Sequence, residues 1–126
     1  KEYLVSLTKK GIEGAAQIRQ MMQDWRNHPL SEIAGERVIM LEDYQQGTAR
    51  NFISGETEAL TIPKSDVLIY YTEEGSKIAA RPSGTEPKIK FYISVNAPLE
   101  RVEDAEMVEK QLDARIEQML LHLNII

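Results

Sequence analysis

The run from Arg81 to Lys90 reads Arg-Pro-Ser-Gly-Thr-Glu-Pro-Lys-Ile-Lys and gathers groups that bind a small anion. Two hydroxyl residues flank Gly84, whose missing Cβ allows backbone conformations in which successive N–H groups converge on one point. Arg81 supplies a planar guanidinium that can hold two oxygens of one phosphate, and two lysines add charge. Two prolines restrict the backbone and lower the entropy lost on binding. The pattern is typical of a loop that accepts a phosphoryl group.

An ordinary turn between two strands is the alternative, because Pro, Ser, Gly and Thr populate turns for conformational reasons alone. Lys77, Arg81, Lys88 and Lys90 make this region locally basic, which supports an anion site, whereas Glu86 counts against one. The residues alone leave both alternatives open. We interpret Glu86 as a brace for Arg81 or Lys88 rather than as a group that faces a ligand.

The elements that position this loop are predicted from the apolar pattern. From Lys88 to Asn96 charged or polar residues alternate with Ile, Phe, Ile and Val, which indicates a strand with one buried face. Residues 66–72 and 76–81 flank Glu73-Glu74-Gly75 and predict a hairpin. An earlier apolar run, 37–41, predicts a further strand, whereas 45–63 is polar and predicts a long connection with one weak strand.

Two segments show the spacing of amphipathic helices. The first ends before Pro29, because a residue that precedes proline avoids the helical region. Its apolar stripe consists of Ile12, Ala15, Ile18, Met22 and Trp25. The second begins near Pro98, and its stripe consists of Val102, Ala105, Val108, Leu112, Ile116, Met119 and Leu123.

Strands joined by short turns are antiparallel, and two amphipathic helices need a face to cover. The predicted fold class is therefore α+β, an antiparallel four-stranded sheet with two helices packed on one face. The other face, which bears Lys88 and Lys90, is left for solvent or a partner.

Composition bounds the function. The chain has 126 residues, of which 42% are hydrophobic and 28% charged, a balance that predicts one soluble globular domain. No cysteine is present, which excludes a disulfide, a thiolate zinc site and a cysteine nucleophile. The formal net charge of −5 argues against nucleic acid as a general partner, and the longest apolar runs are too short to cross a membrane. His28 lies at a helix end beside proline and His122 in the last helical turn, so a solvated or capping role is expected for both rather than catalysis.

The run from Arg81 to Pro87 closely resembles the phosphate-binding loop of the alpha-D-phosphohexomutases, the phosphoglucomutase and phosphomannomutase superfamily. The resemblance extends to 72–77, 91–93 and 38–44, and points to the phosphoglucomutase-like bacterial branch. In that family the loop lies in the fourth, C-terminal domain, a four-stranded antiparallel sheet with two helices. The resemblance thus implies that 11–126 form the C-terminal phosphate-binding domain and that 1–10 are a linker or hinge from a preceding domain.

Carried over residue by residue, the resemblance implies that the phosphate of a hexose phosphate is held by Arg81, Ser83, Gly84 and Thr85, with Lys90 as a further contact and Lys88 as a weaker one. The family's phosphoserine, its magnesium-binding Asp-x-Asp-x-Asp stretch and its Gly-Glu-x-Ser-Gly sugar loop have no counterpart in this sequence. The resemblance therefore implies that the chain has no catalytic and no metal-binding residue, holds no cofactor and is inactive alone. The parent protein is expected to be a cytoplasmic, magnesium-dependent isomerase and phosphotransferase of carbohydrate metabolism, whose other domains are partners.

A free-standing anion- or RNA-binding module that uses the basic sheet face is the second hypothesis. Tyr92 is the one aromatic residue predicted on that face beside Lys88 and Lys90, which is little for a base-stacking platform.

Overall fold

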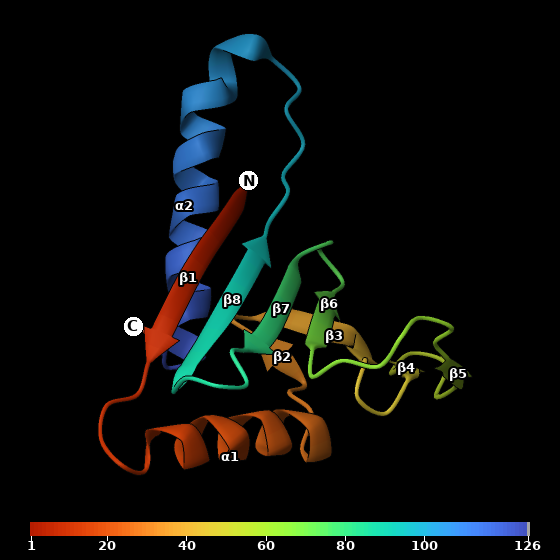
Figure 1. The fold of residues 1–126 in the computed structure, drawn as a ribbon. Helices are drawn as coiled ribbons and strands as arrows, with labels where there is room; N and C mark the ends of the chain where they lie inside the picture. The colour runs from red at the N-terminus through yellow and green to blue at the C-terminus, as the bar shows by residue number, and fades with distance from the viewer. Residues whose placement is uncertain (126) are drawn as a thin grey trace.

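The computed structural model describes residues 1–125 and consists of an antiparallel sheet with two helices (Figure 1). Of the domain expected over 11–126, residue 126 lies outside the described residues. In chain order the elements are β1 (Glu2–Thr8), α1 (Gly14–Asn27), β2 (Glu32–Ile33), β3 (Glu36–Asp43), β4 (Thr48–Asn51), β5 (Thr57–Ala59), β6 (Leu68–Thr72), β7 (Lys77–Pro82), β8 (Lys88–Ser94), the 3-10 helix η1 (Val102–Asp104) and α2 (Ala105–His122).

The sheet has eight strands, so the prediction of four strands is wrong. Its order is β1-β8-β7-β6-β3-β4-β5, with β2 paired to β3, and all pairs are antiparallel. The predicted strands correspond to β3, β6, β7 and β8. The segment 45–63, for which one weak strand was predicted, contains two strands, β4 and β5. They extend the sheet beyond β3 by backbone pairing, which needs no alternating apolar residues.

Strand β1 lies within the segment expected to be a linker or hinge. Its seven residues pair with β8 from Glu2 opposite Ser94 to Thr8 opposite Lys88. Val5 and Leu7 are partly buried against the core, while Ser6 and Thr8 are exposed. This strand makes β8 an interior strand of the sheet, and the hinge role of residues 1–10 stays a prediction.

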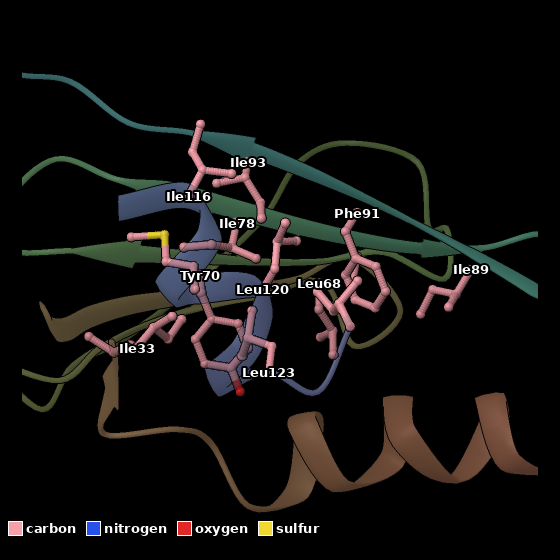
Figure 2. Close-up of a cluster of buried hydrophobic side chains, with 14 of the residues drawn as sticks. Ile33, Leu68, Tyr70, Ile78, Ile89, Phe91, Ile93, Ile116, Leu120 and Leu123 are labelled. Carbon is pink, nitrogen blue, oxygen red and sulfur yellow. The ribbon is translucent and has the colours of Figure 1, made fainter. Parts of the chain in front are cut away.

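Both helices contribute to one hydrophobic core on a single face of the sheet, in agreement with the predicted packing. From α1, Ile18 and Met22 are buried, and the Trp25 ring lies 5.6 Å from that of Phe91. Figure 2 shows side chains of α2 meeting those of β6, β7 and β8 in this core. The buried residues of α2 are Leu112, Ile116, Met119 and Leu120. Each large apolar side chain buried in this way stabilises the fold by about 1.5–3 kcal/mol.

Both helices begin later than predicted. β1 ends at Thr8, and Gly11, with a φ of +93°, lies in the turn that leads into α1. Ile12 is fully exposed in that turn instead of on the helix stripe. Pro98 likewise precedes the second helix, because an extended stretch and η1 carry the chain from β8 to Ala105. Val102 is exposed as a result.

A buried carboxylate joins three elements that are distant in sequence. Glu36, at the start of β3, accepts hydrogen bonds from the hydroxyls of Thr72 and Ser76 at 2.8 and 2.6 Å. Arg115 of α2 donates to the other oxygen of Glu36 at 3.2 and 3.3 Å and to the Asn96 carbonyl at 2.6 Å. These contacts fix α2 to the β6–β7 hairpin.

A second polar contact holds the C-terminal end of α1. The buried Tyr70 hydroxyl donates to the carbonyl of Trp25 and accepts from the N–H of Leu30 at 3.3 Å. Arg26, in the last turn of this helix, forms an ion pair with Asp43 at 2.9 Å. Burial of the Tyr70 phenol raises its pKa to about 12.

We predict that Arg115→Leu lowers the free energy of unfolding by about 2–4 kcal/mol, because it leaves the buried Glu36 carboxylate without a countercharge. Urea unfolding measures the loss. Arg101→Leu is the matched control, since Arg101 pairs with Glu103 at 4.0 Å on the open surface and should change stability by less than about 0.5 kcal/mol. Equal losses in both variants would contradict the structural role of the buried pair.

We predict that the free energy of unfolding falls as pH rises from about 10 to about 12. Folded Tyr70 keeps its proton up to a pKa of about 12, whereas the unfolded chain releases it at the ordinary value of 10.0. The stabilisation is thus complete below pH 10, and about 2–3 kcal/mol is lost by pH 12. Urea unfolding across this range checks it, and Tyr70→Phe should reduce the slope; an unchanged slope in that variant would assign the pH dependence to other groups.

Candidate anion-binding site

The loop between β7 and β8 borders a cavity of about 330 Å³ that is lined mainly by charged and polar groups. The lining residues are Arg81, Pro82, Ser83, Glu86, Lys88 and Lys90. Three cationic side chains and one carboxylate therefore surround the cavity, which gives it a formal charge of +2. The local potential is opposite in sign to the net charge of −5 of the whole chain.

Strand pairing places the cations together. Arg81 of β7 lies directly opposite Lys90 of β8, and residues opposite one another in a sheet point to the same face. Lys88 lies two residues before Lys90 on the same strand and face, about 6–7 Å away along the strand. Between them Ile89 is fully buried, which fixes the alternation because a shift by one residue would bury both lysines.

The loop backbone is closed by its own hydrogen bonds. The N–H of Ser83 donates to the Lys88 carbonyl at 2.9 Å, and the N–H of Lys88 donates to the Glu86 carbonyl at 2.7 Å. Gly84 has a φ of +87°, a conformation that strains residues with a Cβ. Within residues 1–125 no acceptor is found for the N–H groups of Gly84 and Thr85. Two adjacent free donors at a tight turn are suited to bind an anion.

Glu86 forms an ion pair with Lys88, with 3.3 Å between Oε2 and Nζ. This contact agrees with the interpretation of Glu86 as a brace for Lys88, but the side chain also borders the cavity, contrary to the expectation that it does not face a ligand. Both side chains are about half exposed, so the pair contributes roughly 0–1 kcal/mol. An incoming anion can therefore compete with Glu86 for Lys88.

The structure gathers most of the predicted site residues, but not all, around the cavity. Arg81, Ser83, Lys90 and the weaker candidate Lys88 line it. Gly84 and Thr85 are exposed at the tip of the loop and are not among the lining residues, and their contribution would come from backbone N–H groups. Lys77, counted with the basic residues of this region, lies at the opposite end of β7, with its ammonium 5.9 Å from the centre of the Tyr71 ring.

Tertiary structure adds two residues that the sequence did not single out. The N–H of Lys9, just after β1, donates to the carbonyl of Pro87 in the loop at 2.9 Å. Gly14, the first residue of α1, is buried against both of them. The ends of β1, α1 and the loop lie side by side in Figure 1. The available sequence signal was a glycine near the start of an amphipathic helix, because glycine has a low helix propensity.

The histidines lie away from the loop. His122 accepts a hydrogen bond at Nδ1 from the N–H of Ala34 at 2.6 Å, and His28 follows the last residue of α1. In residues 1–125 no three His, Asp or Glu side chains cluster closely enough to hold a metal ion. Over the same residues neither helix has the length and apolar character required to cross a membrane.

Comparison with curated proteins finds similar sequences among staphylococcal phosphoglucomutases. The chain is 39% identical over 114 residues to that of Staphylococcus saprophyticus, a match that covers 90% of this chain and 20% of the relative. It is 38% identical over 113 residues to that of Staphylococcus aureus MRSA252 (90% and 19%), and 41% identical over 93 residues to that of Staphylococcus epidermidis RP62A (74% and 17%). The chain thus spans about a fifth of the length of these relatives. No family model matches the chain.

Proposed function

Because this chain belongs to the phosphoglucomutase family, as the counterpart of a single domain, we propose that it is the domain that anchors the phosphate group of a hexose phosphate. The cavity beside the β7–β8 loop is the observation that carries the proposal. It combines the guanidinium of Arg81, the ammonium groups of Lys88 and Lys90 and the hydroxyl of Ser83. Charge-assisted bonds of this kind recognise phosphate oxygens at about 1.5–3 kcal/mol each.

The parent protein, by this proposal, is an isomerase that moves a phosphoryl group between two positions of a hexose. Its phosphoserine and its Mg²⁺ site belong to other domains, and this chain is the C-terminal one. When the non-reacting phosphate is held, the opposite end of the sugar lies at the phosphoserine of the parent protein. The reacting groups are then already oriented and need not meet by diffusion. Closure of this domain over the substrate would carry β1 along with the sheet, because Glu2–Thr8 pair with β8. The chain alone has no turnover, and cytoplasmic carbohydrate metabolism is the proposed setting.

Titration with phosphate followed by amide NMR tests this function, with Arg81→Ala as the key variant. Inorganic phosphate and glucose 1-phosphate should shift the amides of residues 81–90 with a Kd of roughly millimolar, because only a few charge-assisted bonds offset the cost of association. Arg81→Ala should weaken binding about 10-fold or more and leave the fold intact, because the side chain is exposed.

Lys77→Ala is the matched control: it removes an exposed cation from the opposite end of the same strand and should leave the phosphate Kd within about twofold. A short single-stranded RNA should produce no shifts. Shifts by RNA across the Lys88–Lys90–Tyr92 face, with none by sugar phosphate, would favour the free-standing RNA-binding module instead.

Glu86→Gln is predicted to tighten phosphate binding about 2- to 5-fold. The substitution removes the one negative side chain that lines the cavity and releases Lys88 from its ion pair, at nearly constant volume. The same titration measures the change, which should shrink at high salt. Weaker binding by the variant would show that the ion pair holds Lys88 in its binding position.

A further inference from the structure

Three chain segments meet at Gly14 with space for only a hydrogen atom. A Cβ added to Gly14 would lie 2.2 Å from the carbonyl oxygen of Lys9, 2.9 Å from its carbonyl carbon and 3.1 Å from the Cβ of Pro87. Two of these atoms belong to backbone, which cannot rotate away as the end of a long side chain can. The segments in contact are the end of β1, the start of α1 and the β7–β8 loop.

The glycine at this position is required for space and not for backbone conformation. Six glycines of the chain have positive φ values, and Gly14 is not among them. Alanine has the higher intrinsic helix propensity, so local preference would favour alanine at the first residue of α1. The contact with Lys9 and Pro87 therefore explains a residue that weakens its own helix.

The same contact connects to the anion site. The Lys9 residue whose carbonyl packs on Gly14 donates its N–H to the carbonyl of Pro87 at 2.9 Å. Pro87 precedes Lys88, whose N–H and ammonium both bond to Glu86. A shift of Lys9 or Pro87 thus moves the half of the loop that carries Lys88 relative to Arg81, which is held on β7.

We propose that Gly14 is a positioning residue of the anion site: its close approach to Lys9 and Pro87 sets where Lys88 stands relative to Arg81. The identity of the ligand in this inference rests on the proposed function. The effect of Gly14 on the position of the loop is independent of that function. Gly14 contributes no group to the cavity, so its effect reaches the ligand only through the loop. Any side chain at this position displaces residues 86–88 of the loop and moves the ammonium group of Lys88 away from the guanidinium of Arg81.

Gly14→Ala in the full chain is the test, with inorganic phosphate as the probe. Without phosphate, the amide shifts of residues 83–88 should change and the Lys9 amide should exchange with solvent at least about 10-fold faster, because its bond to Pro87 is displaced. The phosphate Kd should rise about 5-fold or more, since charge-assisted bonds depend steeply on geometry.

Ala16→Gly is the matched control: it weakens the same helix at an exposed position, away from the loop. It should leave the shifts of residues 83–88 and the phosphate Kd within about twofold of the wild type. Loop shifts in Gly14→Ala equal to those of this control would overturn the inference.

Two further outcomes separate the inference from the proposed function. If the wild type binds no phosphate while Gly14→Ala still displaces the loop, the proposed function fails and the positioning role stands. If the variant does not fold, hydrogen exchange of the wild type tests the inference instead. Equal opening free energies for the Lys9 and Lys88 amides would support one coupled unit. An unprotected Lys9 amide would overturn the inference.

Discussion

Strand β8 is hydrogen-bonded along both edges, to β1 and to β7, and the rest of the structure depends on this pairing. Because side chains alternate along a strand, one register commits Ile89, Phe91 and Ile93 to the core and places Lys88 and Lys90 on the other face. The register of β8 therefore sets both the packing of the core and the position of the charged side chains. The apolar face is covered by both helices, and the polar face presents the candidate site at the end nearest the β7–β8 loop.

The two helices are fixed by polar contacts as well as by apolar ones. The C-terminal end of α1 is held by the Tyr70 hydroxyl, and α2 is held by the ion pair between Arg115 and Glu36. The N-terminal end of α1 packs at Gly14 against the loop. Apolar burial supplies most of the free energy of folding but little direction, whereas these hydrogen bonds have defined geometry and determine where each helix lies. The loop is consequently held from the sheet and from α1 together.

Much of this could be predicted from the sequence. The strands β3, β6, β7 and β8 and the two helices follow from apolar periodicity, and the match to phosphoglucomutases confirms the family that the Arg81–Pro87 motif indicated. The polar segment 45–63 holds two short strands where one weak strand was predicted, because such strands form by backbone pairing with a neighbour, which leaves no apolar pattern in the sequence. Strand β1 was missed for another reason: Val5 and Leu7 do alternate toward the core, but the family resemblance assigned residues 1–10 to a linker.

By itself the sequence determined the chemistry of the candidate site. Arg, Lys, Ser and a conformationally free Gly lie within ten consecutive residues, so a single turn of the chain brings them close together. Only the tertiary structure decided which groups face the cavity. It placed Lys88 with Lys90 and Arg81, separated Lys77 by the length of β7, and brought Lys9 and Gly14 against Pro87. Local spacing fixes the contacts within one loop, whereas contacts between residues more than seventy positions apart depend on the register of β1 and on the packing of α1, which are properties of the whole fold.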